Sequence, residues 1–348
     1  IHYAMKANND RRIMEIMCSH GLGADCVSGN EVRWAIECGI PASGIVYAGV
    51  GKKDSEIIYS LEQGIFSFNC ESREELEVIN SIAAAMGVTA EVALRINPDV
   101  DPQTHKYVTT GKAENKFGIS YKEIDEVIAS LGDFGNVNIT GLHFHIGSQI
   151  TNMEVFGKLC SRGNSLYSWF TGEGFNLTHV NLGGGLGIDY VAPDENPIPD
   201  FERYFGTFAD NLDIPRHVKV RFELGRSLVA QCGELISTVI YTKVNGGGRN
   251  IALVDASMTD LIRPALYQSK HVIENLDGDG RPEGCFTIGG TACDSSDIFA
   301  ENICLPSLRR GDLITIKSTW AYGASMASRY NMHHIPASVY RDEIGTEI

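Results

Sequence analysis

Residues 1–10 read IHYAMKANND, and this stretch contains the pattern that predicts the fold. A short apolar segment, residues 1–5, is followed immediately by Lys6 and then by the turn-forming residues 7–10. An apolar segment of this length with turn residues behind it is typical of a short buried strand. The sequence therefore predicts a strand that carries a lysine at its C-terminal end.

The same arrangement recurs along the first two thirds of the chain. Strand-like segments are predicted at residues 2–5, 23–27, 45–48, 65–69, 92–96, 140–145, 179–182 and 218–222. Amphipathic stretches with apolar residues at helical spacing lie between them, such as SREELEVINSIAAAMG, in which Ser72 is a typical helix start and Gly87 a typical stop. Eight strand–helix units match a (β/α)8 TIM barrel, which usually takes about 250 residues. A doubly wound open sheet is the alternative that this alternation leaves open.

The pattern changes at about residue 230, where strand-like runs replace the helices. These runs are ELISTVIYTKV, NIALVDA, CFTIGG and DLITIKSTW, and NGGGRN between the first two is typical of a hairpin turn. The sequence therefore predicts two domains. Residues 1–229 form an α/β barrel, and residues 230–348 form an antiparallel β-sandwich or β-barrel.

Composition limits the classes of function. Of the 348 residues, 43% are hydrophobic and 21% are charged, which is the profile of a globular protein. The formal net charge of -15 repels phosphate backbones, so nucleic-acid binding is not expected. No apolar run approaches the roughly 18 residues that span a bilayer, and no signal peptide is recognisable, so a membrane partner is not expected either.

The nine cysteines are scattered singly and contain no CxxC pair. This spacing favours reduced thiols in a cytoplasmic protein over a disulfide framework. It also gives no zinc site, and no other metal site is predicted.

The unusual residues lie at the predicted C-terminal ends of the strands, where TIM barrels have their active sites. Lys6 follows the first strand, His145 ends the sixth and is followed by Ser148, the glycines 183–185 follow the seventh, and Glu223 with Arg226 follows the eighth. A glycine run lets backbone N–H groups approach a phosphate closely. Lysine condenses with the aldehyde of pyridoxal phosphate, and a carboxylate keeps the pyridine nitrogen of that cofactor protonated. The combination predicts a pyridoxal phosphate site.

Each of these features has a simpler interpretation when it is taken alone. An isolated lysine is usually a surface residue, and an isolated histidine is usually a hydrogen-bonded core residue. The glycines of NLGGGLG do not have the GxGxxG spacing of a dinucleotide site, and GVGKKDS lacks the first glycine of a Walker A loop. A cofactor site is favoured because Lys6, His145, the glycines 183–185 and Glu223 all lie at predicted strand ends.

Ten motifs, in order along essentially all 348 residues, resemble the diaminopimelate decarboxylase family, whose members are pyridoxal phosphate enzymes of the alanine-racemase-like barrel class. The motifs are HYAMKAN, GADCVSGNE, RINPDV, NKFGIS, GLHFHIGSQI, NLGGGLGIDY, ELGR, DLIRPALY, CDSSD and AYGASMASRYN. The family normally carries a few dozen residues before the lysine strand, so the given chain is expected to lack that segment.

The resemblance implies a role for each matching residue. Lys6 would hold pyridoxal phosphate, His145 would stack on its ring, and Glu223 would pair with the pyridinium nitrogen. The phosphate group would be bound by Ser148, Gly183, Gly184, Gly185 and Tyr322. Gly225 and Arg226 would also contact the cofactor. Substrate would be held by Arg226, Arg263, Tyr267, Asp294 and Tyr322. Cys293 would be the proton donor, and Cys293 and Asp294 would both come from the other subunit of a homodimer. The catalytic residues implied are Lys6, His145 and Cys293.

The chain departs from the family pattern at three positions. Leu224 replaces a usual proline in ELGR, Asp294 replaces the usual glutamate after Cys293, and Trp320 stands where a small residue is common. The resemblance implies decarboxylation of meso-diaminopimelate to L-lysine and CO2. The departures at Asp294 and Trp320 leave a decarboxylase of a related basic or D-amino acid, such as lysine or ornithine, as the alternative. A non-catalytic regulatory paralogue is a further alternative, which the presence of both Lys6 and Cys293 disfavours.

Overall fold

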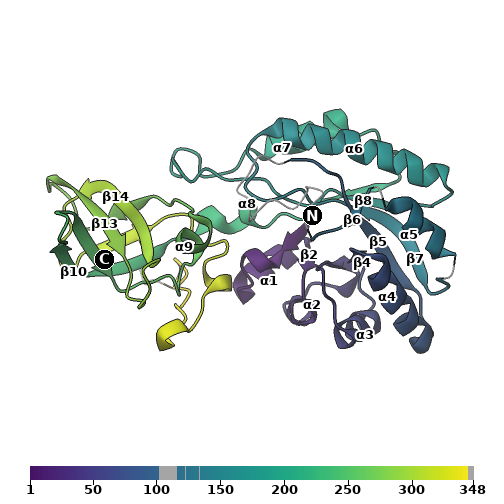
Figure 1. Ribbon diagram of the computed structural model, residues 1–348, viewed down its shortest axis with the longest axis horizontal. Coiled ribbons are helices and arrows are strands. Elements are labelled where there is room, and N and C mark those ends of the chain that lie inside the picture. Colours follow the sequence, from purple (N-terminus) through teal and green to yellow (C-terminus); the bar gives the residue numbers. More distant parts are fainter. Residues whose placement is uncertain (102–115, 122, 133, 344–348) are drawn as a thin grey trace. The chain divides into compact units, whose positions relative to one another are not determined.

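The computed structural model describes residues 1–101, 116–121, 123–132 and 134–343 (Figure 1). Asn115 of the NKFGIS motif lies outside the described residues. The chain divides into two compact units. The first contains residues 1–188 and 198–228, and the second contains residues 189–197 and 229–348.

The first unit is built on a parallel sheet. Its strands, in order across the sheet, are β1 (His2–Ala4), β2 (Gly23–Cys26), β3 (Ile45–Tyr47), β4 (Ser67–Cys70), β5 (Ala90–Asn97), β7 (Val137–His143), β8 (His179–Asn181) and β9 (Lys219–Arg221). The short strand β6 (Ile119–Ser120) pairs with β5. The His2 N–H donates to the Phe222 carbonyl at 2.8 Å, and the Ala4 N–H donates to the Leu224 carbonyl at 2.9 Å. These bonds join the last strand to the first. The sheet is therefore a barrel, as predicted, and the open-sheet alternative is wrong.

Helices connect the strands and lie outside the barrel in Figure 1. They are α1 (Arg11–Ser19), α2 (Gly29–Glu37), α3 (Asp54–Gln63), α4 (Arg73–Met86), α5 (Ile124–Leu131), α6 (Met153–Gly172), α7 (Phe201–Asn211) and α8 (Arg226–Val229). The predicted signals of α4 are confirmed: Ser72 Oγ accepts the Glu75 N–H at 3.2 Å, and Gly87 ends the helix in the left-handed conformation. Among the described residues, no helix combines the length and the apolar character needed to cross a membrane.

Three strands of the barrel contribute a cluster of the buried His2 and His179 with the half-buried Arg221, and the half-buried ring of Phe66 packs against it. Arg221 Nη1 donates to His2 Nε2 at 2.8 Å, and His2 Nδ1 donates to the Gly44 carbonyl at 3.0 Å. The Arg221 guanidinium also covers the Phe66 ring at 3.9 Å. Burial, and then the charge of Arg221, lowers the pKa of His2 to about 4 and that of His179 to about 3. Both imidazoles are therefore neutral at pH 7.

These two pKa values predict that the barrel loses stability in mild acid. Both folded-state pKa values lie below the unfolded value of 6.5, so the unfolded chain binds more protons as the pH falls below 6.5. Each histidine should contribute a loss of up to about 1.4 kcal/mol per pH unit between pH 6.5 and pH 4. Urea unfolding of the parent and of His179→Gln at several pH values measures this slope. The variant should show the shallower slope, and equal slopes would contradict the assignment.

The second unit contains a six-stranded sheet. Its strands are β10 (Leu235–Val244), β11 (Asn250–Val254), β12 (Ile273–Asn275), β13 (Glu283–Gly289), β14 (Ile298–Pro306) and β15 (Leu313–Ile316), in the order β12-β15-β10-β11-β13-β14. The helix α9 (Arg263–Tyr267) precedes β12. The predicted hairpin is present between β10 and β11, where Asn245 Oδ1 accepts the Gly247 and Arg249 N–H groups. The expected β domain is confirmed with one correction: β11 and β13 are parallel, so the sheet is mixed.

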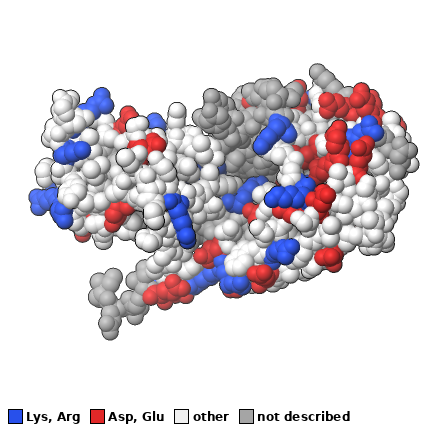
Figure 2. Space-filling model, turned by 60° about the horizontal axis from the view of Figure 1, so that its bottom comes forward, with Lys and Arg blue, Asp and Glu red and all other residues white. Residues whose placement is uncertain are grey.

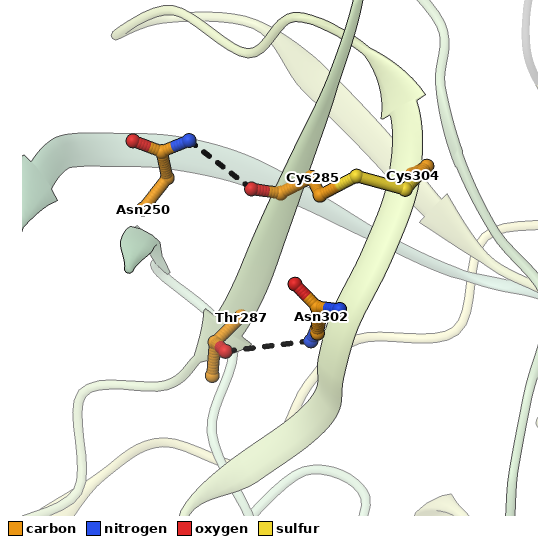
Figure 3. Close-up of a disulfide and its surroundings, with 5 residues drawn as sticks. All are labelled: Asn250, Cys285, Thr287, Asn302 and Cys304. Atoms are coloured by element: carbon orange, nitrogen blue, oxygen red, sulfur yellow. Dashed lines mark hydrogen bonds between the residues drawn. A yellow bond between two sulfur atoms is a disulfide. The ribbon is translucent and has the colours of Figure 1, made fainter. Parts of the chain in front are cut away.

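The expectation that all cysteines are reduced is wrong for one pair. Cys285 in β13 and Cys304 in β14 lie opposite each other in the ladder and form a disulfide with an S–S distance of 2.02 Å (Figure 3). The Asn250 amide donates to the Cys285 carbonyl at 3.2 Å beside it. The two cysteines are 19 residues apart and acquire their contact only through the register of the two strands. The other seven cysteines are in the thiol form.

Removal of this disulfide is expected to destabilise the second unit. The bond closes a loop over a sequence separation of 19, for which the chain-entropy relation gives about 3 kcal/mol. Urea unfolding with and without a reducing agent should show this difference in the parent and none in Cys285→Ser/Cys304→Ser. Seven thiols should react in the denatured, unreduced protein, since nine cysteines less two in the disulfide leave seven. A count of nine would contradict the bond.

Candidate active site

Lys6 lies in a single helical turn (Met5–Ala7) directly after β1. Its ammonium group is 3.3 Å from Oδ2 of Asp25, which is buried near the end of β2. The Lys6 side chain is 38% exposed, so its amine can be reached from outside the barrel wall. Burial, and then the charge of Glu223, raises the pKa of Asp25 to about 7, although Lys6 opposes this rise. Asp25 was not among the predicted site residues, although it is a carboxyl inside the predicted strand GADCV.

Glu223, two residues beyond β9, is the centre of a buried network. Its Oε1 accepts hydrogen bonds from the amides of Asn69 at 3.0 Å and Asn181 at 2.7 Å, and His143 Nε2 donates to its Oε2 at 2.9 Å. Burial alone would raise the pKa of Glu223, but the charge and hydrogen bond of His143 and the charge of Lys6 bring it well below its usual value. Glu223 is therefore an anion. Asn69, His143 and Asn181 were not predicted, although each stands in the last part of a barrel strand.

His145 lies two residues beyond β7 and is half-buried. Burial, followed by the charges of Lys6 and Arg95, brings the pKa of His145 well below its ordinary value. Its ring is therefore neutral, and its Nδ1 accepts the Gly184 N–H at 3.4 Å. A neutral imidazole at the mouth of the barrel suits stacking on an aromatic ring.

The glycine run after β8 requires glycine for steric reasons. Gly183 and Gly185 have φ values of +67° and +105°, which other residues rarely adopt. A Cβ on Gly184 would lie 2.0 Å from the Glu223 carbonyl oxygen, and one on Gly185 would lie 2.6 Å from the Gly147 carbonyl oxygen. The Gly183 N–H is already bonded to Asn181 Oδ1 at 2.9 Å. The run therefore brings bare backbone close to the loops that follow β7 and β9.

Arg226 and Ser148 are in direct contact. Arg226 begins α8, is buried, and donates from Nη2 and Nε to Ser148 Oγ at 3.1 and 3.3 Å. Gly225, just before it, packs so closely on β1 that an added Cβ would lie 3.0 Å from Ala4 Cβ. The predicted barrel residues thus converge on the loops at the C-terminal ends of the strands.

The remaining predicted residues belong to the second unit and stand on three separate segments. Arg263 and Tyr267 are the first and last residues of α9. Cys293 and Asp294 lie in the loop between β13 and β14, and both are exposed. Asp294 accepts hydrogen bonds from the N–H and hydroxyl groups of Ser296, which lower the pKa of its carboxyl. Tyr322 follows β15 and has a positive φ of 59°, an uncommon conformation for a side chain of its size.

Trp320 stands where the family usually has a small residue, and the structure gives its ring a packing role. A Cβ on Gly233 would lie 2.1 Å from the Trp320 ring, so the indole rests directly on the Gly233 backbone. The ring of Tyr340 meets it edge-on at 6.0 Å. The absence of a side chain at Gly233 therefore makes room for the Trp320 ring within the second unit.

The barrel residues fit pyridoxal phosphate. Lys6 offers a reachable amine, Glu223 is a buried anion held by three hydrogen bonds, and the glycine run allows close approach of the backbone beside them. Among the described residues, Oδ1 of Asp25 is buried and has no hydrogen-bond partner, as expected of a polar atom that faces a ligand. The described residues contain no group of side chains suited to a metal ion.

Comparisons with known proteins agree with this geometry. Residues 1–230 match the family described as pyridoxal-dependent decarboxylase, pyridoxal binding domain. A diaminopimelate decarboxylase from Bacteroides thetaiotaomicron is 50% identical over 344 residues, which are 99% of this chain and 89% of the relative. The crystal structure of the diaminopimelate decarboxylase from Helicobacter pylori, complexed with L-lysine, is similar with a TM-score of 0.88 and 36% identity over 95% of this chain and 82% of that chain.

A more distant structure has the same fold. The arginine decarboxylase of a Paramecium bursaria Chlorella virus has a TM-score of 0.83 and 25% identity, over 95% of this chain and 86% of that chain. The higher identity and wide coverage of the Bacteroides relative decide the family. The chain belongs to the diaminopimelate decarboxylase family of pyridoxal-dependent decarboxylases.

Proposed function

We propose that this enzyme decarboxylates meso-diaminopimelate to L-lysine and CO2 with pyridoxal phosphate as its cofactor. The observation that carries the proposal is the pair of Lys6 and the buried, anionic Glu223 at the mouth of one barrel. The family of the chain and its relatives at up to 50% identity support this reaction. The seven cysteines outside the disulfide favour a cytoplasmic location, whereas the Cys285–Cys304 bond is of a kind that is rare there.

The residues of the barrel account for the cofactor. Bound pyridoxal phosphate would withdraw electrons from the carbon that loses CO2. Lys6 would hold it through the amine, and Asp25, 3.3 Å away with a pKa of about 7, is placed to take the proton that Lys6 must lose before it reacts. Glu223 remains charged and would keep a proton on the ring nitrogen, while the neutral His145 would cover the ring face. Ser148, the glycine run, Gly225 and Arg226 would hold the phosphate end.

The residues of the second unit account for the substrate. Arg263 and Tyr267, with Arg226 and Tyr322, would hold its carboxylates, and Asp294 would hold its distal amine. Cys293 would return a proton to the carbon that has lost CO2. We propose that Cys293 and Asp294 act in the site of the partner subunit of a homodimer, and the exposure of both side chains supports this arrangement.

A panel of substrates tests the proposed reaction. Purified protein with pyridoxal phosphate is given meso-diaminopimelate, lysine, ornithine or arginine, and CO2 and the amine product are measured. The proposal expects turnover of meso-diaminopimelate at least about a hundredfold above the others, since a guanidinium grip on a second carboxylate is worth a few kcal/mol. Asp294 and the fold shared with a viral arginine decarboxylase favour a basic amino acid as the second candidate. If only lysine, ornithine or arginine is decarboxylated, the second candidate replaces the proposed function. If none of the four compounds is decarboxylated, a regulatory paralogue is favoured.

Subunit mixing tests the shared site. Lys6→Ala and Cys293→Ala proteins should each be nearly inactive, and their mixed dimers contain one site in which both residues are intact. Activity should therefore rise, after exchange, to as much as about a quarter of the parent value per subunit, because half of the dimers are mixed and each has one good site of two. Differently tagged proteins measure the exchange directly. Proven exchange without recovery would place both residues in the site of one subunit.

A further inference from the structure

Arg263 is a buried cation whose surroundings in the second unit determine how it can be used. The residue is 4% exposed. Its Nη1 lies 3.0 Å from Nε2 of His271, and its guanidinium carbon lies 4.8 Å from the centre of the Tyr190 ring. The rings of Tyr190 and His271 meet edge-on at 5.2 Å. Two aromatic side chains therefore hold the guanidinium.

The hydrogen bonds of His271 determine where its proton is. A guanidinium can only donate, so Nε2 of His271 must be the acceptor in this contact. Its Nδ1 lies 2.8 Å from the Lys317 carbonyl oxygen, which can only accept, so Nδ1 carries the proton. His271 is thus neutral and has one tautomer, with both ring nitrogens engaged.

The Lys317 carbonyl is itself fixed in place. Lys317 follows β15, and its N–H donates to the Val272 carbonyl at 2.9 Å, which extends the ladder of β12 and β15 by one bond. Its ammonium group pairs with Glu274 at 2.8 Å and with Asp194. Because Lys317 is tied on both sides, the imidazole that bonds to it has little freedom to turn.

The loop that carries Tyr190 is also ordered by its own hydrogen bonds. The Asp189 carboxylate accepts the N–H groups of Val191 at 2.7 Å and Ala192 at 3.0 Å, and the Asn196 amide at 2.9 Å. This turn sets the direction in which Tyr190 leaves the backbone. The phenol ring consequently meets both Arg263 and His271.

We propose that His271 and Tyr190 are positioning residues that set the substrate preference through Arg263. This inference rests on the proposed function, in which Arg263 binds the distal carboxylate of a diamino dicarboxylic acid. Both supports are uncharged, so neither of them competes with a substrate carboxylate for the guanidinium, whereas a carboxylate in the place of His271 would. A cation fixed in advance loses little freedom when it binds, and a second carboxylate on the substrate therefore gains affinity.

Two substitutions of His271 test whether this residue positions Arg263 or only stabilises the fold. His271→Phe keeps a ring but removes both hydrogen bonds, while in His271→Gln the side-chain oxygen can accept from Arg263 and the amide can donate to Lys317. For meso-diaminopimelate, His271→Phe should raise KM about 10- to 100-fold with kcat changed less than about threefold, the effect of losing a hydrogen bond to a charged group. His271→Gln should restore KM to within about fivefold of the parent.

L-Lysine is the matched ligand because it lacks the distal carboxylate. Its inhibition constant should change less than about twofold in His271→Phe, so the ratio of KM for meso-diaminopimelate to the inhibition constant of lysine should rise about 10- to 100-fold. Asn250→Ala is the control: this exposed residue bonds to the Cys285 carbonyl in the same unit, and it should leave both constants unchanged. Tyr190→Leu should raise KM for meso-diaminopimelate about 3- to 30-fold, the value of a desolvated cation–π contact.

The outcomes distinguish this inference from the function on which it rests. Equal losses for meso-diaminopimelate and lysine in His271→Phe, or no loss for either, would overturn the inference. Thermal unfolding shows whether that variant folds, and if it does not, the same pair of constants in Tyr190→Leu decides. A parent that does not turn over meso-diaminopimelate would overturn the proposed function instead. In that case, meso-diaminopimelate and lysine would be measured as inhibitors of the reaction that the parent does catalyse. Their two inhibition constants in the parent and in His271→Phe would then test whether His271 positions Arg263.

Discussion

Lys6→Ala is expected to lower kcat by about four orders of magnitude, the upper range for a group that transfers protons, because the same amine also holds the cofactor. The position of Lys6 after β1, its reachable amine and its contact with Asp25 are the basis of this expectation. Steady-state measurement of CO2 release from meso-diaminopimelate at saturating pyridoxal phosphate gives the effect. The loss should persist in Lys6→Arg, which keeps the positive charge but has no nucleophilic amine.

Lys53→Ala is the matched control for this loss. Lys53 is an exposed lysine at the start of α3, and removing its side chain should change kcat less than about twofold, as is usual for a surface site away from the chemistry. A small amine added to the Lys6→Ala protein should restore part of the activity. Lys6→Ala protein with more than about a tenth of the parent activity would show that another group does the work of Lys6.

Glu223→Gln is expected to have the second largest effect. The substitution keeps the shape of the side chain but removes the charge that His143 and Lys6 stabilise. Altering one member of a buried charge pair costs roughly 2–5 kcal/mol, which is about two to three orders of magnitude in rate. The loss should appear in kcat and little in KM for meso-diaminopimelate, because Glu223 is expected to act on the cofactor ring and not on the substrate.

Asn69→Ala is the comparison that isolates the charge of Glu223. It removes one hydrogen bond of the network, at 3.0 Å, and leaves the carboxylate with those of Asn181 and His143. The loss of kcat should therefore be about tenfold, one hydrogen bond to a charged group. If Glu223→Gln costs no more than Asn69→Ala, the charge of Glu223 has no special role in the reaction.

The surface of the protein carries charges of both signs. Figure 2 shows acidic side chains interspersed with basic ones over the face that it draws, in keeping with the net charge of -15. Arg226 and Arg263, the cations proposed to bind the substrate, are by contrast buried.

The barrel could be predicted from the sequence because both of its signals are local. Each strand is a short apolar run, and each helix has its own start and stop residues, as Ser72 and Gly87 show for α4. The candidate residues of the barrel were predicted by one rule, that barrel sites lie at the C-terminal ends of strands, whereas those of the second unit were implied by the family resemblance. Applied more strictly, the same rule would also have indicated Asn69, His143 and Asn181.

The features that were missed depend on contacts between distant segments. Cys285 and Cys304 meet only through the register of β13 and β14, and the parallel pairing of β11 with β13 has no signal in either strand. In the sequence Asp25 is a single polar residue in a predicted strand, and only the fold brings it to 3.3 Å from Lys6. The proposed role of His271 likewise depends on its contacts with Arg263 and with the Lys317 carbonyl, which the sequence does not show.

The most direct test of the central claim is to find the residue that holds the cofactor. The protein is saturated with pyridoxal phosphate and reduced with borohydride, which fixes the cofactor permanently to the amine that carries it. The protein is then digested, and the labelled peptide is identified by mass spectrometry. The account predicts one cofactor per chain, attached to Lys6 in the peptide that contains HYAMKAN. A label on Lys52, Lys53 or any other lysine, or a protein that takes up no cofactor, would contradict it.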